Sequence, residues 1–222
     1  DLPISTDQYL LALNTRWESY NFDISGFLKS AVLAYGDMVG QTQRKWWVEK
    51  TPLTELYADD LSKWYPKMKM IYIVRDPRAN FSTLKKWKSS VQQTISTSRF
   101  AFEWSRSIDS NTRNRKHLEI LTIRYEDLIN KPKMYMTKVS RFLDIAYDDC
   151  LQVSTINGHS FEGNSAFGDK FQGVSTRSQE RWKEELSGDE ICLIEDLVHD
   201  QMNMYGYPKM PALSTDGVKA SL

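Results

Sequence analysis

A short apolar stretch, Met68–Val74, stands out in the pattern of hydrophobic and polar positions along the chain. It is interrupted only by Lys69 and is rich in β-branched and aromatic side chains, which favours a strand buried on both faces. The stretch ends at Arg75, and the Asp-Pro pair that follows predicts a helix beginning near Arg78. The pattern therefore predicts a strand that presents an arginine at its carboxyl end.

Arg75 is a candidate anion-binding residue because of this position. Ligands of open α/β sheets bind at the carboxyl ends of the strands, and a guanidinium that faces the start of a helix suits an anion such as phosphate. The alternative is an arginine held in a salt bridge at a strand end. The pattern alone does not separate the two interpretations.

Two further apolar runs predict strands of the same sheet. Trp46–Val48 is followed by Glu49-Lys50-Thr51-Pro52, which repeats the order of strand, cation and proline-started helix. Leu118–Ile123 is followed by the polar sequence Arg124–Leu128. The helical pattern Leu53–Tyr65 between the first two runs predicts a βαβ unit with parallel strands and a right-handed crossover. We therefore expect an α/β fold in three layers, with a mostly parallel central sheet flanked by helices.

Amphipathic patterns and helix caps predict the surrounding helices. The expected starting points are Ser5 or Thr6, Asp23 or Ser25, a residue just before Phe100, Lys131-Pro132, and a capping box of Ser187 and Glu190 that opens a helix running to Gly206. Between about residues 144 and 179 the chain has little periodicity and four glycines. A loop of this length is usually functional or disordered.

The amino-acid composition of the chain limits which partners and cofactors are expected. Lys plus Arg and Asp plus Glu number 29 each, so nothing in the overall charge favours nucleic acid or a membrane surface as a partner. No apolar run approaches the roughly 20 residues of a membrane span. Two cysteines and three histidines without ligand spacing predict neither a metal site nor a disulfide framework. We expect a single domain over residues 1–222 with a loose tail from about 209, in either the cytoplasm or the Golgi lumen.

Four blocks of sequence occur in a fixed order along the chain. They are Glu49-Lys50-Thr51-Pro52, then Ile73–Arg78 with Thr83, then Arg124–Leu128, and finally Arg181-Trp182-Lys183. Together they resemble the sulfotransferases that use 3′-phosphoadenosine 5′-phosphosulfate (PAPS). The resemblance implies a P-loop-NTPase-like fold and bound PAPS, or its product 3′-phosphoadenosine 5′-phosphate (PAP), without a metal. It also implies sulfuryl transfer to a hydroxyl or amine of a small-molecule, carbohydrate or peptide acceptor.

The resemblance also implies roles for individual residues. Arg75 and Thr83 match the positions that hold the 3′-phosphate of the nucleotide, and Tyr125 matches the tyrosine that approaches the adenine. Lys50 matches the lysine near the phosphosulfate and is the main catalytic candidate. Arg177 is the nearest basic residue at the offset of a loop that closes over the 3′-phosphate, although the Arg-Lys-Gly triplet of the family is not reproduced.

Two features depart from the pattern of this family. Pro52 stands where the branch acting on small phenols and steroids has its histidine base, so the chain is closer to the branches that modify carbohydrates, tyrosines or bacterial metabolites. The amino-terminal strand and phosphosulfate loop of the family are not found in residues 1–222. We expect either a fragment or a degenerate relative, and the first residue, Asp1, together with the greater length of the family favours a fragment.

The general base for the acceptor is left open by the sequence. Glu18, Asp23 and His159 are candidates, although a surface or structural role is the more common one for such residues. His159 is of most interest because it lies in the long loop. One competing hypothesis is a non-catalytic sulfotransferase-like module that binds a nucleotide, another anion or a partner protein. A second is a P-loop kinase relative, against which the lack of a Gly-Lys-Ser/Thr sequence counts.

Overall fold

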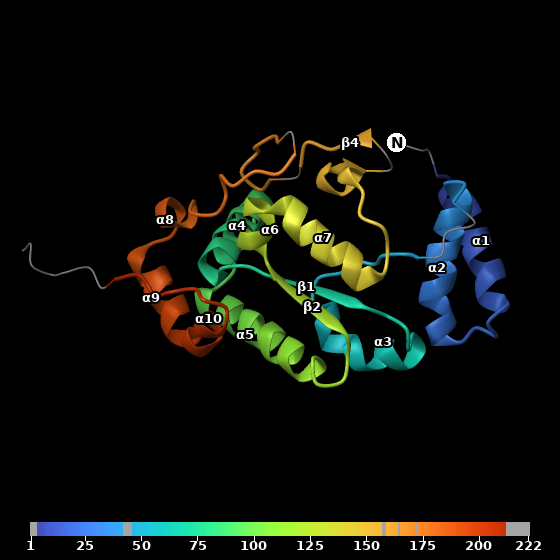
Figure 1. Ribbon diagram of the computed structural model, residues 1–222, viewed down its shortest axis with the longest axis horizontal. Coiled ribbons are helices and arrows are strands. Elements are labelled where there is room, and N and C mark those ends of the chain that lie inside the picture. Colours follow the sequence, from blue (N-terminus) through green and yellow to red (C-terminus); the bar gives the residue numbers. More distant parts are fainter. Residues whose placement is uncertain (1–3, 42–45, 157–158, 164, 172, 212–222) are drawn as a thin grey trace, which may run out of the picture. The chain divides into compact units, whose positions relative to one another are not determined.

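The computed structural model describes residues 4–41, 46–156, 159–163, 165–171 and 173–211 (Figure 1). The chain divides into two compact units. The first comprises residues 1–54 and 63–66, and the second comprises residues 55–62 and 67–222. A single sulfotransferase-like domain stays a prediction, and most of the predicted tail, from residue 212, lies outside the described residues.

The first unit contains a helical hairpin of α1 (Thr6–Glu18) and α2 (Ile24–Met38). The carboxylate of Asp23 caps α2 by accepting the backbone N–H of Ser25 at 2.9 Å. The buried residues of α2 are the small Gly26, Ser30 and Ala34, four positions apart, which lets the two helices approach closely. A Cβ on Gly26 would lie 2.5 Å from the Cβ of Tyr20, so this position has room only for glycine.

The predicted strand Trp46–Val48 is not formed. Residues 46–50 have no regular structure, and all of them are exposed. Instead of joining a strand, Trp47 packs edge-to-face against Tyr65, with ring centroids 5.7 Å apart. The predicted βαβ unit that starts at Trp46 is therefore wrong, because three apolar residues form a strand only where a neighbouring strand pairs with them. The predicted helix Leu53–Tyr65 is divided into η1 (Thr54–Tyr57) and α3 (Ala58–Trp64).

The second unit is built on the parallel strands β1 (Met70–Val74) and β2 (Ile120–Arg124), which pair from Met70 with Ile120 to Val74 with Arg124. Both strands were predicted. Between them lie α4 (Pro77–Ser90) and α5 (Thr97–Asn114), and after β2 come α6 (Tyr125–Asn130) and α7 (Pro132–Leu143). Helices cover both sides of the strand pair, with α5 on one side and α7 on the other (Figure 1). The predicted α/β architecture is therefore present.

Only one face of β1 is well buried, which corrects the prediction of burial on both faces. Val74 is 2% exposed, whereas Ile71 and Ile73 are 36% and 45% exposed. Successive side chains of a strand point to opposite faces, so these exposed isoleucines share one face. On the other face the hydroxyl of Tyr72 lies 2.8 Å from that of Ser107 on α5.

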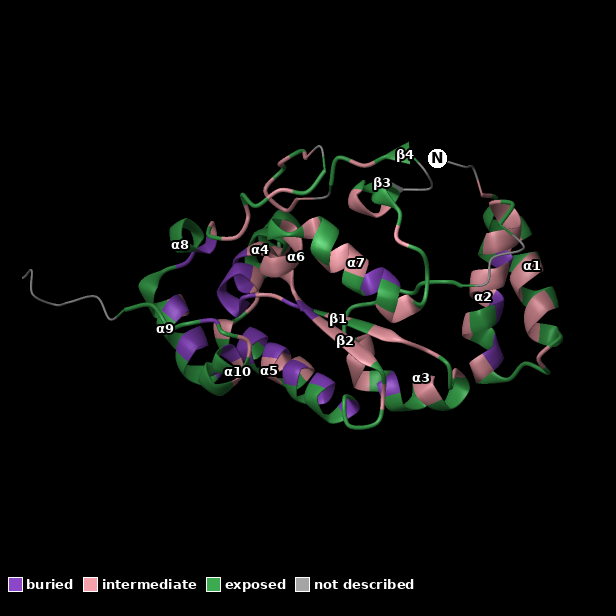
Figure 2. Ribbon diagram, viewed as in Figure 1, coloured by how far each residue is buried: buried purple, intermediate pink, exposed green. Residues whose placement is uncertain are grey.

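The hydrophobic core of the second unit lies where α4 and α5 meet α8 (Trp182–Glu185), α9 (Gly188–Leu197) and α10 (His199–Met204) (Figure 2). The predicted capping box of Ser187 and Glu190 opens α9. The helix predicted to run to Gly206 is interrupted at Val198, where α9 ends and α10 begins. Large members of this core are Phe81, Phe100, Trp104, Ile108, Ile194 and Met202.

The segment between α7 and α8 is mostly irregular, as predicted. It contains the short turn η2 (Asp149–Gln152) and an antiparallel pair, β3 (Thr155–Ile156) with β4 (His159–Ser160). Its later part is tied to the start of α8, because Arg181 forms a 2.6 Å ion pair with Asp169 and lies over the ring of Phe167 at 4.4 Å. Among the described residues no helix has both the length and the apolarity of a membrane span.

Candidate functional site

The local sequence fixes Arg75 at the carboxyl end of β1. The strand ends at Val74, and the side chain of Asp76 caps α4 by accepting the backbone N–H of Arg78 at 2.9 Å. Pro77 occupies the first turn of α4, where its missing N–H costs nothing. The predicted strand-to-helix turn is confirmed, and Arg75 lies between the two elements.

The guanidinium of Arg75 brings together the residues predicted to bind the 3′-phosphate and the adenine. Its Nη1 donates to the hydroxyl of Thr83 on α4 at 3.3 Å, and its centre lies 4.8 Å from the ring centroid of Tyr125 on α6. Its Nη2 donates to the backbone carbonyl of Ser178 at 3.2 Å. Three segments that are distant in sequence therefore meet around one cation.

The charge of Arg75 is not neutralised within the described part of the second unit. Its two hydrogen-bond acceptors are a hydroxyl and a carbonyl, and no carboxylate there forms an ion pair with it. Its Nε is buried and has no hydrogen-bond partner. A partly buried guanidinium with unused donors is costly unless an anion completes it. The salt-bridge alternative is thus not what these residues form, and the site suits an anionic ligand.

Ser178 was not predicted as a site residue. Its carbonyl accepts from Arg75, and its hydroxyl lies 3.4 Å from that of Tyr125. The next residue, Gln179, donates from its side chain to the backbone carbonyl of Glu126 at 3.4 Å. Residues 178 and 179 therefore lie directly over the strand ends. The only signal in the sequence was the neighbouring Arg177, which had been matched to a loop closing over the phosphate.

Glu126 stabilises the site by linking its own segment to those of Asp76 and Tyr207. Its Oε1 accepts the backbone N–H of Asp76 at 3.0 Å, and its Oε2 accepts the hydroxyl of Tyr207 at 2.7 Å. Burial, and then the hydrogen bond to Glu126, raise the pKa of Tyr207 well above its usual range. Tyr207 therefore stays protonated and keeps donating. In the Tyr-Glu-Asp sequence, Tyr125 thus places its ring in the site, and Glu126 holds the surrounding segments together through hydrogen bonds.

Arg78 behaves in the opposite way to Arg75, although only three positions separate them. Arg78 is 4% exposed and pairs with Asp76 at 2.7 Å and with Glu195 on α9 at 2.5 Å. Its guanidinium also lies 4.2 Å from the ring of Trp182. Burial lowers the pKa of Arg78, but the hydrogen bonds and charges of the two carboxylates outweigh it, and the net shift is upward. Arg78 is therefore a structural cation.

Of the remaining predicted site residues, Arg177 and His159 lie in the second unit and form no hydrogen bond with Arg75, Thr83 or Tyr125 among the described residues. Arg177 is exposed, and its backbone N–H donates to the Ser175 hydroxyl at 3.3 Å. His159 is exposed on β4. Lys50 is exposed and belongs to the first unit, whereas Arg75 belongs to the second. The roles of these three residues stay predictions.

The candidate bases Glu18 and Asp23 are both exposed in the first unit. Asp23 already serves as the cap of α2, and the side-chain hydrogen bond from Ser25 lowers the pKa of its carboxyl. A carboxylate with a lowered pKa is a weaker proton acceptor, so the structure gives Asp23 a structural role. Among the described residues no group of three or more His, Cys, Asp or Glu side chains could hold a metal ion.

Comparison with known protein sequences finds one family and a curated relative. A model of the Sulfotransferase family matches residues 16–149, which include Arg75, Thr83 and Tyr125. Over 134 residues the chain is 24% identical to a Caenorhabditis briggsae protein named as a protein-tyrosine sulfotransferase. The alignment covers 59% of this chain and 46% of that protein, so the chain spans about half the length of the curated relative it matches.

The solved structures that resemble this chain include two sulfotransferase domains of the same fold. The domain from the curacin biosynthetic pathway has a TM-score of 0.52 at 18% identity and covers 86% of this chain and 77% of its own. The domain from the Synechococcus PCC 7002 olefin synthase has a TM-score of 0.56 at 18% identity and covers 95% and 79%. These similarities confirm the predicted fold class. The family match over more than half of the sequence shows that this chain belongs to the sulfotransferase family.

Proposed function

We propose that this chain carries the nucleotide site of a PAPS-dependent sulfotransferase. The observation that carries the proposal is the guanidinium of Arg75, which donates to the hydroxyl of Thr83 and lies beside the ring of Tyr125, with no carboxylate partner among the residues that the structure describes. A phosphate monoester brings close to two negative charges and several acceptor oxygens, and these match the unused donors of Arg75. The ring of Tyr125 offers a flat surface to an aromatic base.

The reaction that we propose is an in-line displacement at sulfur. The bond between the sulfuryl group and the phosphate oxygen of PAPS breaks while the acceptor oxygen or nitrogen forms a bond to sulfur, and the acceptor loses its proton to a base. Such a transfer depends on positioning and on neutralising charge at the leaving phosphate. We assign that charge role to Lys50, and the base to a carboxylate or to His159, because Pro52 removes the histidine of the phenol branch.

Binding of PAP tests the proposed nucleotide site directly. Replacing Thr83 with valine keeps the shape of the side chain but removes its hydroxyl. In the structure this hydroxyl donates to the carbonyl of Ala79 at 3.0 Å, and we expect it to turn and donate to the phosphate when PAP binds. A hydrogen bond to a charged group contributes about 1.5–3 kcal/mol, so the dissociation constant should rise by roughly 10- to 100-fold in calorimetric titration. Thr83→Ser keeps the hydroxyl and should stay within about threefold of the wild type. If the valine variant binds PAP with the affinity of the wild type, Thr83 does not contact the nucleotide.

Sulfate transfer separates the enzyme from the non-catalytic alternative. With the full-length protein, radiolabelled PAPS and a panel of phenolic, carbohydrate and tyrosine-peptide acceptors, we expect transfer by the wild type. Lys50→Met should lower kcat by at least about 100-fold, because the charge acts mainly on the leaving group in the transition state. The exposed Lys67 offers a matched control, since Lys67→Met should leave kcat unchanged. PAP binding by a wild type that transfers sulfate to none of these acceptors would favour a binding module.

A further inference from the structure

The outer edge of β2 is an unpaired strand edge. Within the described residues β2 pairs only with β1, where the backbone N–H of Met70 donates to the carbonyl of Glu119 at 3.1 Å. Backbone groups of successive strand residues point to opposite edges, so those of Ile120 and Thr122 face away from β1. No other described residue forms a hydrogen bond with them. This edge therefore presents a short row of free donors and acceptors.

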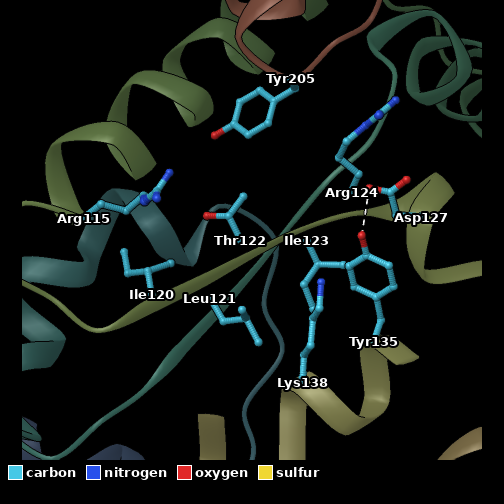
Figure 3. A pocket seen from close by; sticks show the side chains of 10 residues that line it. All are labelled: Arg115, Ile120, Leu121, Thr122, Ile123, Arg124, Asp127, Tyr135, Lys138 and Tyr205. Atoms are coloured by element: carbon cyan, nitrogen blue, oxygen red, sulfur yellow. Dashed lines mark hydrogen bonds between the residues drawn. The ribbon is translucent and has the colours of Figure 1, made fainter. Parts of the chain in front are cut away.

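A cavity of about 400 Å³ follows this edge over the whole length of the strand (Figure 3). One side is formed by the residue that follows α5 and the residue that follows α10, and the other by side chains of α7. Besides the five residues of β2, its walls are Arg115, Asp127, Tyr135, Lys138 and Tyr205. The cavity is distinct from the cluster around Arg75, which contributes no residue to it.

The cavity is lined by more positive than negative charge. Arg115, Arg124 and Lys138 are cations, and Asp127 is the single carboxylate, so the formal charge is 3 − 1 = +2. Asp127 accepts the hydroxyl of Tyr135 at 3.1 Å, and none of the three cations forms an ion pair with a described carboxylate. The Nε of Arg124 is buried without a hydrogen-bond partner. The walls therefore have a surplus of donors for an anionic ligand.

These donors lie on both sides of the strand. In Figure 3 Thr122 points towards Tyr205 and Arg115, and Leu121 points to the opposite side, where Lys138 lies. The amide of the fully buried Asn111 donates to the hydroxyls of Thr122 at 3.3 Å and Tyr205 at 3.2 Å. Because Asn111 already supplies a donor to the Tyr205 oxygen, the Tyr205 proton is free to bond elsewhere. The arrangement is held by a buried residue rather than by surface side chains alone.

We propose that this edge binds an extended acidic segment of another protein, which adds to the sheet beside β2. An added strand satisfies the free backbone groups of Ile120 and Thr122, which a nucleotide or a simple phosphate does not. Side chains of an added strand alternate between its two faces, so cations on both sides select neighbouring Asp or Glu residues. Five strand residues span roughly 16 Å, which fits a segment of five to seven residues.

The test uses a fluorescein-labelled peptide of the sequence TVEEEVT and fluorescence anisotropy at low ionic strength. We expect Arg115→Glu and Lys138→Glu each to weaken binding by at least about fivefold, and the double variant to weaken it further. Lys116→Glu and Arg141→Glu are the matched controls, because they make the same charge change just after α5 and on α7 at exposed residues outside the cavity. These controls should change affinity by less than about twofold.

Two further measurements test the strand geometry. A peptide N-methylated at alternate residues should lose binding, because it cannot donate to the edge of β2. Amide hydrogen exchange at Ile120 and Thr122 should slow when the unmodified peptide binds. The proposal is overturned if the peptide does not bind, if the control variants lose as much affinity as the cavity variants, if the N-methylated peptide binds equally well, or if a heparin fragment binds at this edge and the peptide does not.

Discussion

Arg75→Ala is expected to abolish measurable PAP binding. In the proposed site the guanidinium of Arg75 contacts both Thr83 and Tyr125, and an arginine binds a phosphate through two charge-assisted hydrogen bonds. At about 1.5–3 kcal/mol each, their loss corresponds to a rise in the dissociation constant of roughly 100- to 10,000-fold. Arg75→Lys keeps the charge but not the paired donors, and should recover only part of the affinity.

Stability measurements keep this result interpretable. Arg75 has no carboxylate partner among the described residues, so its removal leaves no buried negative charge behind, and the midpoint of urea unfolding should change little. Arg106→Ala, at an exposed position on α5, is the matched control for loss of one positive charge and should bind PAP like the wild type. A folded Arg75→Ala protein with wild-type affinity would contradict both the site and the proposed donor.

The central part of this site was predictable because it depends on short-range features and on one register. The apolar run before Arg75 and the Asp-Pro pair after it define the end of β1 and the start of α4 locally. Thr83 was assigned by the resemblance to the sulfotransferases, and its place on α4 brings its hydroxyl within reach of Arg75. Tyr125 is 50 residues after Arg75 in the sequence. Because Val74 pairs with Arg124, however, the residues that immediately follow the two strands, Arg75 and Tyr125, are neighbours.

The parts that were missed depend on contacts that no local pattern encodes. Trp46–Val48 has the composition of a strand, yet pairing requires a partner strand, and Trp47 packs on Tyr65 instead. Ser178 reaches Arg75 through its backbone carbonyl, across a separation of 103 residues. A carbonyl carries no sequence signature, because every residue has one. Glu126 could be recognised as part of a motif, but its structural role depends on a hydrogen bond from Tyr207, which lies 81 residues away.

The two arginines of the Arg-Asp-Pro-Arg sequence show why a motif alone does not assign a role. Both side chains are positive and both lie beside an aromatic ring, Tyr125 for Arg75 and Trp182 for Arg78. Only the carboxylates distinguish them, because Arg78 has two partners and Arg75 has none among the described residues. The unpaired cation is therefore available to a ligand, whereas the paired one joins α4 to α9.

Arg78→Met is expected to give the largest loss of stability among single changes near the site. Methionine replaces the unbranched aliphatic part of the arginine side chain but not its charge. It therefore leaves Asp76 and Glu195, which are 8% and 5% exposed, without their cation. Breaking a buried ion pair by removing one partner costs about 3–5 kcal/mol, a large share of the roughly 5–15 kcal/mol that stabilises a typical protein. Urea unfolding followed by tryptophan fluorescence should therefore show a clearly lower midpoint.

Lys85→Met is the matched control, because Lys85 also lies on α4 and pairs with a residue of α9, Glu190, at 2.6 Å. That pair is largely exposed on the lysine side, so its loss should cost only about 0–1 kcal/mol. Combining Arg78→Met with Glu195→Gln should recover part of the stability, since one buried charge is then removed with its partner. If Arg78→Met unfolds at the same urea concentration as Lys85→Met, Arg78 does not hold α9 against α4.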